Sequence, residues 1–323
     1  MCLYPKLIKN RKYVMNKKNG GVVPPVKDER TLWVPVGCGE CMECRKQKSR
    51  EWQVRLSEEV RHDKTGKFIT LTFSNESIKE LARECKGLSG YNLDNWIAKR
   101  AVRKFLERWR KKYKRSAKHW LITELGHKGT ENIHMHGIIW TRESMDEIER
   151  IWKYGHIWKG KGEHKINYVN EKTIGYLVKY VSKQDKDHKY YKPKVLTSPG
   201  IGSNYMERED AKRNKFNGDK TREHYTTRTG TKLALPIYYR NKTYTEEERE
   251  QLWLQKLDKG ERWVMGKRVD ISKGEENYWT ILKEEQAKNK RLGYGDGSID
   301  WEKKNYENEL RRLKLKERIA KAK

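Results

Sequence analysis

The sequence has no long hydrophobic run and little apolar character overall. Hydrophobic residues make up 35% of its 323 positions, and the mean hydropathy is −1.11. No apolar stretch approaches the roughly 18 residues that a transmembrane helix requires. The opening MCLYPKLIKN also lacks the apolar segment of a signal peptide. We therefore expect a protein that neither spans a membrane nor is secreted.

Acidic residues are too few to balance the basic ones. The chain has 45 Asp and Glu against 74 Lys and Arg, which leaves a formal net charge of +29. A basic excess of this size indicates a polyanionic partner, and nucleic acid is the first candidate. Phenylalanine is scarce too, with four residues beside 12 Trp and 18 Tyr. Trp and Tyr can stack on bases, although they can equally fill a small core.

Cysteines are few, and their number is odd. Cys2, Cys38, Cys41, Cys44 and Cys85 are the only five, and three of them lie in CGECMEC. An odd count without a secretory signal argues against a disulfide framework. The tight spacing favours a structural zinc site, with Cys2 or Cys85 as the fourth ligand. An iron–sulfur cluster and three unligated thiols are the alternatives.

The pattern of apolar residues predicts an α+β protein. Between residues 67 and 184 it predicts, in order, a strand at 67–74, a helix at 93–115, a hairpin of 118–126 and 132–140, a helix at 144–155, short strands at 155–162 and 164–169, and a helix at 170–184. Ser144 and Asn170 are the expected N-caps of the last two helices. This order resembles an antiparallel ferredoxin-like sheet, the split βαβ arrangement, with extra strands and flanking helices.

The flanking segments carry weaker patterns. Residues 1–50 are irregular and basic, and 44–63 is predicted to be a helix. A loop is expected at 194–206, one or two strands at 227–242, and helices from 244 onward.

Basic residues are concentrated on one side of the predicted helix 93–115 and in the region 45–55. One-sided charge of this kind favours contact with phosphates, although a solvated helix face is the alternative. The candidate DNA-binding residues are Arg100, Arg103, Lys104, Arg108, Arg45 and Arg50.

The second strand of the hairpin, NIHMHGIIW, places two histidines one residue apart in an apolar run. Alternate residues of a strand share a face, so His134 and His136 point the same way. If the turn centres on Gly129, Glu124 lies opposite His134, with the two Cβ atoms about 5 Å apart. Glu124, His134 and His136 thus form a candidate site for a divalent cation, and His127 in the turn is an alternative ligand.

The predicted helix 170–184 carries two stripes at helical spacing. Ile174, Leu177, Val178 and Val181 form an aliphatic stripe that accounts for packing, and a second stripe faces nearly the opposite way. The second stripe consists of Tyr176, Lys179, Tyr180 and Lys183. Two phenols one turn apart beside ammonium groups are candidate nucleophiles, although two interfacial tyrosines are the alternative.

Several motifs together resemble those of a known superfamily. YLVKYVSK at 176–183 matches YxxKYxxK, and HMH upstream matches His-hydrophobic-His; in that order they resemble the HUH-superfamily rolling-circle replication initiators. FITLTFS is similar to the first motif of that family. The opening MC, CGECMECRKQKSREWQVR and SPGIG look like the initiators of microviruses, single-stranded DNA phages, and most of all the gokushovirus branch. Many relatives have Arg-Pro where this chain has Asn132 and Ile133.

The resemblance implies an HUH endonuclease that nicks single-stranded DNA at the viral origin. Mg²⁺ or Mn²⁺ would be held by the His pair, although two imidazoles also suit zinc or nickel. A tyrosine would form a 5′-phosphotyrosine intermediate, and religation would end rolling-circle replication. Host polymerase and replication helicase would be partners in the bacterial cytoplasm. The opposing hypothesis is a basic zinc-containing nucleic-acid-binding protein without catalytic activity.

The resemblance and the patterns together divide the chain into three parts. Residues 1–60 are expected to be a basic cysteine-rich segment with a possible zinc site, and 61–205 the HUH endonuclease core. Residues 206–323 are expected to be a basic extension, with strands followed by helices.

Overall fold

The structure, a computed structural model, describes residues 2–127, 131–159 and 167–321. The chain forms two compact units, each built from two segments. The first, here called the cysteine unit, consists of residues 1–54 and 205–298. The second, here called the sheet unit, consists of residues 55–204 and 299–323. The boundary at residue 54 falls inside helix α1 (Met42–His62).

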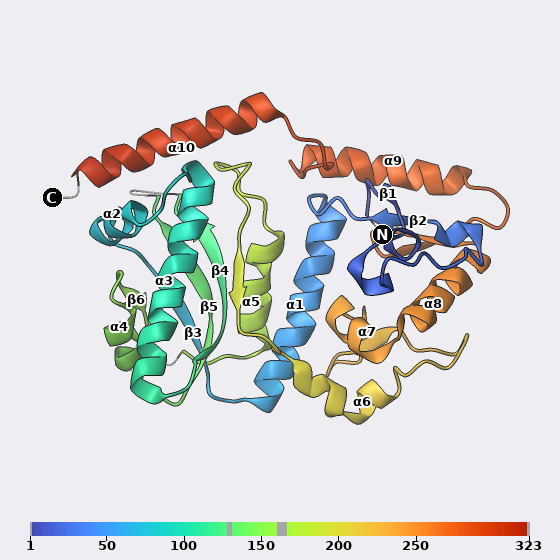
Figure 1. Ribbon diagram of the computed structural model, residues 1–323, viewed down its shortest axis with the longest axis horizontal. Coiled ribbons are helices and arrows are strands. Elements are labelled where there is room, and N and C mark those ends of the chain that lie inside the picture. Colours follow the sequence, from blue (N-terminus) through green and yellow to red (C-terminus); the bar gives the residue numbers. More distant parts are fainter. Residues whose placement is uncertain (1, 128–130, 160–166, 322–323) are drawn as a thin grey trace. The chain divides into compact units, whose positions relative to one another are not determined.

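The sheet unit is organised around one antiparallel sheet (Figure 1). Its strand order is β6-β3-β5-β4-β7, and every neighbouring pair is antiparallel. The strands are β3 (Gly66–Leu71), β4 (Lys118–Leu125), β5 (Ile133–Trp140), β6 (Ile157–Trp158) and β7 (Val195–Thr197). A mixed α+β fold with a helix-flanked antiparallel sheet is therefore confirmed.

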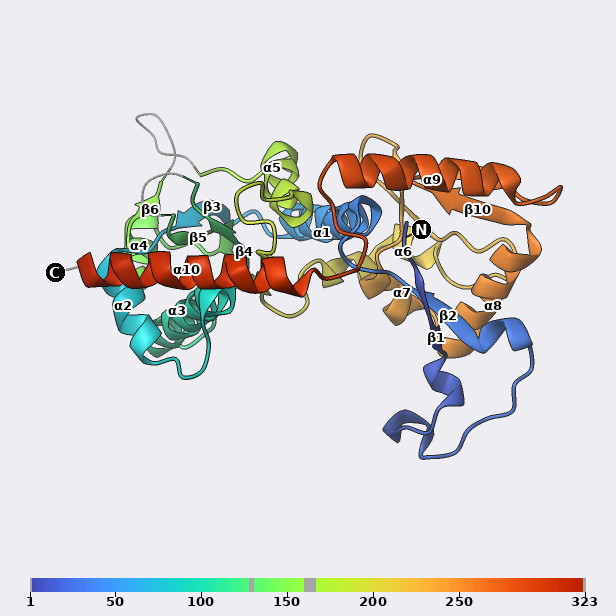
Figure 2. The same ribbon diagram turned by 90° about the horizontal axis from the view of Figure 1, so that it is seen from above.

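Helices lie on both faces of this sheet. Figure 2 shows α3 and α5 on opposite sides of the central strands. Ile97, Ala101 and Phe105 of α3 join Met135 and Ile139 of β5 in the main core. Besides the end of α1, the helices are α2 (Asn75–Arg83), α3 (Gly90–Tyr113), α4 (Met145–Trp152), α5 (Glu171–Ser182) and α10 (Trp301–Lys321). Within the described part of the chain, no helix has both the length and the apolar character needed to cross a membrane.

The hairpin and the two helix caps expected from the sequence are confirmed. Glu124 pairs with His134 and Ile122 with His136, as the turn position predicted. The Ser144 side chain accepts a hydrogen bond from the Glu147 amide at the start of α4. Asn170 and Thr173 form a reciprocal capping box at the start of α5.

Gly137 fixes the register of the central strands. It pairs with Ile69 of β3 on one side and with Leu121 of β4 on the other. A Cβ atom at this position would lie 2.1 Å from the carbonyl oxygen of Trp120. No other residue fits here without moving β4, and a slip by one residue would turn His136 to the wrong face.

The cysteine unit contains three two-stranded sheets, each antiparallel, and several helices. One of its cores surrounds Tyr205 and Tyr239, and another contains Leu3, Cys41 and Leu282. Besides the start of α1 and short 3-10 turns, the elements are β1 (Lys6–Lys9), β2 (Trp33–Val36), α6 (Glu209–Lys212), β8 (His224–Thr226), β9 (Lys232–Ala234), α7 (Ile237–Thr243), α8 (Glu246–Asp258), β10 (Glu261–Val264), β11 (Lys267–Asp270) and α9 (Glu276–Arg291).

Several elements differ from the sequence-based expectation. The expected loop at 194–206 contains β7, which is held by pairing with β4. Part of the region expected as strand is helix α7, which begins after Pro236 and buries Tyr239. The hairpin of β10 and β11 lies where only helices were expected, because its Met265-Gly266 turn lacks the usual Asn-Gly or Asp-Gly signal.

Two further differences concern the region around β3 and β6. Helix α2, capped by Ser74, was not predicted. Part of the strands expected at 155–162 and 164–169 lies outside the described residues. Within the described part, Tyr168 forms a single bridge with Lys67.

A buried ion pair attaches α10 to the sheet unit. Arg311 donates two hydrogen bonds to Asp94 of α3, at 2.8 and 3.0 Å, and both side chains are almost completely buried. Arg311 also donates to the backbone oxygen of Glu131 in the β4–β5 connection. In addition, Arg318 donates to the Asn132 side chain at 2.7 Å. Helix α10 therefore supports the segment that leads directly into His134.

We expect Arg311→Met to lower the free energy of unfolding of the sheet unit by about 3–5 kcal/mol, because Asp94 would remain buried without a partner. Urea denaturation followed by tryptophan fluorescence measures this change. Arg312→Met is the matched control, since Arg312 is more exposed and pairs only with Glu309 on the same helix. Equal losses in the two variants would contradict a special role for the buried pair.

Candidate active site

Glu124, His134 and His136 converge on one side of the sheet. The Nε2 atoms of His134 and His136 lie 3.2 and 3.0 Å from the same oxygen of Glu124, Oε2. One ligand atom from each residue lies within 4.8 Å of the other two. Ile133, Met135 and Ile139 are buried on the opposite side, as strand alternation predicted.

The outer nitrogens of both imidazoles are held by neighbouring groups. His134 Nδ1 lies 3.4 Å from the backbone oxygen of Asn132, and His136 Nδ1 lies 3.0 Å from the hydroxyl of Thr70. A histidine that donates through Nδ1 presents the lone pair of Nε2, which is the arrangement found around bound metals. Two imidazoles and a carboxylate with oriented outer nitrogens fit a divalent cation. The sequence signal for Thr70 was its position on the polar face of β3.

Lys183 completes the polar contacts of Glu124. Its Nζ lies 2.8 Å from Oε1, the carboxylate oxygen that the histidines leave free. Burial alone would raise the pKa of Glu124, but hydrogen bonds from His134, His136 and Lys183 outweigh burial and lower it. Burial lowers the pKa of His136, although its hydrogen bond with Glu124 acts in the opposite direction. The site therefore holds a carboxylate beside a neutral His136 imidazole at pH 7.

The two tyrosines of α5 lie against the histidines. The Tyr180 ring stacks on the His136 ring, with centroids 4.5 Å apart and an interplanar angle of 15°. The Tyr176 and Tyr180 hydroxyls are hydrogen-bonded to each other, and their ring centroids are 5.3 Å apart. Tyr176 is 44% exposed and also contacts Phe68 edge-on. Burial, followed by the hydrogen bond with Tyr176, raises the pKa of Tyr180.

The aliphatic stripe of α5 is buried, as expected. Ile174, Leu177, Val178 and Val181 all lie in the interior, and α5 contacts β4, the strand that carries Glu124. Lys183 lies 5.6 Å from the centre of the Tyr180 ring, whereas Lys179 is exposed to solvent. His127 does not join Glu124: its Nδ1 lies 2.8 Å from Asp187, and its Nε2 lies 3.7 Å from Asp185.

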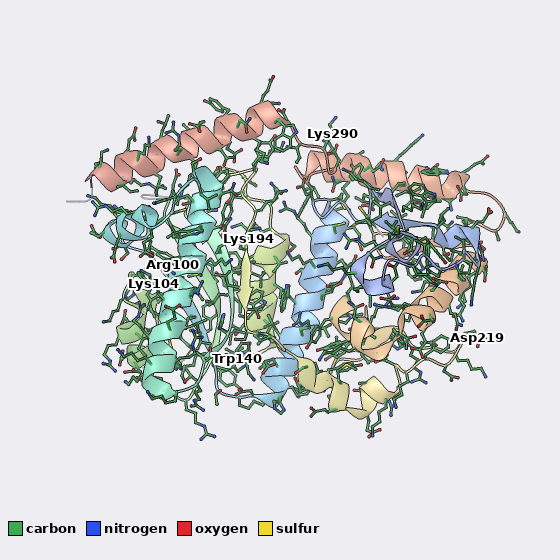
Figure 3. The ribbon with its side chains drawn as sticks, in the orientation of Figure 1. Arg100, Lys104, Trp140, Lys194, Asp219 and Lys290 are labelled. Carbon is green, nitrogen blue, oxygen red and sulfur yellow. The ribbon has the colours of Figure 1, made fainter. Side chains whose placement is uncertain are left out.

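Many of the candidate DNA-binding residues are engaged within the protein. Arg100 and Lys104, labelled on α3 in Figure 3, both pair with Glu84. Arg108 donates to the backbone oxygens of Ile151 and Trp152 at the end of α4. The DNA-binding role of these side chains stays a prediction.

The other candidate cations have partners as well. Arg103 pairs with Glu107 on the same helix, and Arg50 pairs with Glu43. The Arg45 guanidinium lies 5.8 Å from the centre of the Tyr294 ring, and burial lowers its pKa.

Four cysteines of the cysteine unit form a second candidate metal site. The sulfur atoms of Cys2, Cys38, Cys41 and Cys44 all lie within 4.8 Å of one another. Cys2 and Cys41 Sγ are 3.8 Å apart, close to the separation of about 3.8 Å implied by tetrahedral zinc with bonds of about 2.3 Å. Cys2 is therefore the fourth member, whereas Cys85 belongs to the sheet unit. The cluster could hold a metal such as zinc.

Backbone amides surround these sulfur atoms. The amides of Tyr4 and Cys38 donate to Cys2 Sγ, and the amide of Cys41 donates to Cys38 Sγ. A hydrogen bond from the Cys44 thiol lowers the pKa of Cys41 to about 4. Amide donors stabilise thiolates, which are the form that binds metal.

Comparison with known families adds one finding. Residues 66–185 match the family model of the replication-associated protein ORF2. The matched segment covers less than half of the chain, but it begins with β3 and extends just beyond α5. It therefore contains Glu124, both histidines of the site, and both tyrosines.

Neither the curated proteins nor the solved structures include a significant match to this chain. The family match is consistent with a rolling-circle replication initiator and supports a role in DNA replication, which implies DNA binding.

We expect protein purified without chelator to contain about one zinc ion per chain, bound by the four clustered cysteines. Cys41→Ser should lose the zinc, because Cys41 is buried at the centre of the group. Cys85→Ser should retain it. Elemental analysis of all three proteins measures the content: brown protein containing iron would favour the cluster alternative, and metal-free wild-type protein would favour free thiols.

Proposed function

We propose that the protein is a metal-dependent DNA-nicking and strand-transfer endonuclease that initiates rolling-circle replication at a viral origin. The observation that carries this proposal is the position of Tyr176 and Tyr180. Their hydroxyls are in contact, and Tyr180 stacks directly on His136 of the candidate metal site. A packing role alone gives no reason for two phenols and a buried carboxylate to share this location.

The strand order supports the same proposal. Strands β3, β4, β5 and β6 occur in the sheet as β6-β3-β5-β4, which is the order of a ferredoxin-like split βαβ sheet. In the proposed HUH arrangement the two central strands supply the polar face. Helix α5 follows β6 and supplies the tyrosines.

Glu124, His134 and His136 would hold the cation, which we propose to be Mg²⁺ or Mn²⁺. When bound, such an ion polarises a phosphate and stabilises the charge that develops on it. Lys183 places a further positive charge beside Glu124 and the Tyr180 ring. Thr70 and Asn132 keep the imidazoles oriented.

In the proposed reaction, a tyrosine Oη attacks the scissile phosphorus and loses its proton to solvent. The Oη–P bond forms while the bond from phosphorus to the 3′ oxygen breaks, and that oxygen takes up a proton. The products are a 5′-phosphotyrosine and a free 3′-OH. Attack of a 3′-OH on the phosphotyrosine reverses these steps and religates the strand.

Two tyrosines suit a reaction that must cut twice. While one phenol is esterified to DNA, the other is still available for the second cleavage. Tyr176 and Tyr180 lie on the same face of α5, one turn apart, so a small shift of the helix or the strand exchanges them. We therefore propose that both act as nucleophiles, with Lys179 and Lys183 supporting them electrostatically.

The remaining partners follow from the proposed reaction. The protein would act in the host bacterial cytoplasm on origin and single-stranded DNA, together with the host helicase and polymerase. The cysteine unit would carry a structural zinc ion, and residues 61–205 would form the endonuclease core.

We expect Tyr176→Phe and Tyr180→Phe each to retain some single-turnover cleavage, whereas the double variant should form no covalent adduct. Phenylalanine preserves ring packing and removes only the nucleophile. Because no origin is needed, the substrate is a labelled pool of random single-stranded oligonucleotides with Mn²⁺, analysed on a denaturing gel. Sequencing of the attached DNA then identifies the cleavage site.

The comparison of the two single variants decides between one nucleophile and two. If one variant loses all cleavage and the other loses none, this is a one-tyrosine enzyme. If wild-type protein forms no adduct with any substrate, the non-catalytic nucleic-acid-binding hypothesis is favoured.

We expect His134→Ala, His136→Ala and Glu124→Ala each to reduce cleavage by roughly 100-fold or more, since each removes a ligand that helps stabilise charge on the phosphate. DNA affinity should change little, because it depends mainly on the wider basic surface. Cleavage rates and fluorescence anisotropy measure the two effects. Normal cleavage by a His134→Ala/His136→Ala variant would disprove the assignment of the metal site.

A further inference from the structure

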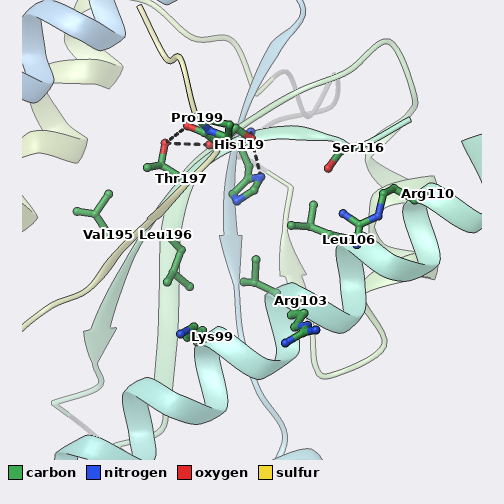
Figure 4. A pocket seen from close by; sticks show the side chains of 12 residues that line it. Lys99, Arg103, Leu106, Arg110, Ser116, His119, Val195, Leu196, Thr197 and Pro199 are labelled. Atoms are coloured by element: carbon green, nitrogen blue, oxygen red, sulfur yellow. Dashed lines mark hydrogen bonds between the residues drawn. The ribbon is translucent and has the colours of Figure 1, made fainter. Parts of the chain in front are cut away.

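A groove lies between α3 and the edge strand β7, and it contains no residue of the candidate active site (Figure 4). Its volume is about 530 Å³, within the usual size range of ligand sites. His119 of β4 lines the groove and shares its side of the strand with Leu121, which packs in the core with α3. Glu124 has the opposite alternation. The groove and the candidate active site therefore lie on opposite faces of the same sheet.

One wall of the groove is a row of cations. Lys99, Arg103 and Arg110 lie along one stripe of α3, separated by about 6 and 10 Å along the helix axis. Arg103 pairs with Glu107, whereas Lys99 and Arg110 have no ion pair within the described part of the chain. None of the described lining residues is acidic. The groove thus has a positive charge that the protein itself leaves largely unbalanced.

The rest of the lining is apolar, with hydroxyl groups at its edge. Val102 and Leu106 of α3 face Leu196 of β7 across the groove. Ser116 and Ser198 add hydroxyls that can donate hydrogen bonds. A row of cations beside an apolar surface matches a ligand whose anionic backbone repeats along one side and whose rings project from it.

We propose that this groove binds a segment of single-stranded nucleic acid other than the one being cut. The cations would contact successive phosphates, while sugars and bases lie against the apolar wall. The inference rests on the proposed function for the identity of the strand. A strand held here must pass around an edge of the sheet to reach the tyrosines, because the sheet separates the two sites.

The proposal separates the basic residues of α3 into two groups. Arg100 and Lys104 are neutralised by Glu84 outside the groove. Lys99 and Arg110 lie in the groove without such a partner within the described residues. Both pairs lie on the same helix, so they form a matched set of variants with equal changes in net charge.

The test compares Lys99→Gln/Arg110→Gln with Arg100→Gln/Lys104→Gln. Both are made in the Tyr176→Phe/Tyr180→Phe background, so that no cleavage complicates binding. Fluorescence anisotropy with a labelled 30-nucleotide oligothymidylate is recorded over a range of salt concentrations. We expect the groove variant to lose roughly tenfold in affinity and about 1.4 from the slope of log K against log salt, at about 0.7 for each lost phosphate contact. The Glu84-paired variant should lose clearly less of both.

Equal losses in the two variants would overturn the proposal, because they would indicate a diffuse effect of net charge. Unchanged DNA binding with lost binding of a polyglutamate peptide would also overturn it and assign the groove to an acidic protein segment. Circular dichroism checks that both variants are folded. Because this assay requires no cleavage, its outcome is independent of whether the tyrosines attack DNA.

Discussion

The register between β4 and β5 is the constraint on which the candidate active site depends. Because Gly137 lies against the Trp120 carbonyl, the two strands meet in one alignment, and Glu124 is fixed opposite His134. Both imidazoles then meet one carboxylate oxygen. Burying a carboxylate is costly unless it is paired, and here two imidazoles and the Lys183 ammonium share that task. The sheet thus preorganises the polar groups, while α5 brings the phenols to them.

Much of this site follows from local sequence rules. Strand alternation alone puts His134 and His136 on one face, and a short turn puts Glu124 beside them. Helical spacing alone separates the buried aliphatic stripe of α5 from Tyr176 and Tyr180. These rules work because each relates residues only a few positions apart.

What the sequence did not reveal depends on long-range contacts. Arg311 and Asp94 are 217 positions apart, and nothing in either segment indicates that they form a buried pair. Strand β7 has three residues and exists because β4 offers it an edge. Likewise, the pattern of basic residues on helix 93–115 could not distinguish Lys104, which is neutralised by Glu84, from Lys99 in the groove. Composition locates charge along the chain, whereas only the fold determines which charges are available to a ligand.

The interleaving of the two units has a consequence for the order in which the protein is made. The cysteine unit needs residues 1–54 together with 205–298, so it stays incomplete while the ribosome synthesises the intervening sheet unit. Val264 and Val269, which pack in the same core as Cys41, emerge about 220 residues after the cysteines, or roughly 10–40 s later at bacterial-to-eukaryotic rates. During that interval the four thiols are held together by no hydrophobic core. A metal ion captured early would organise the nascent N-terminus until its packing partners are synthesised.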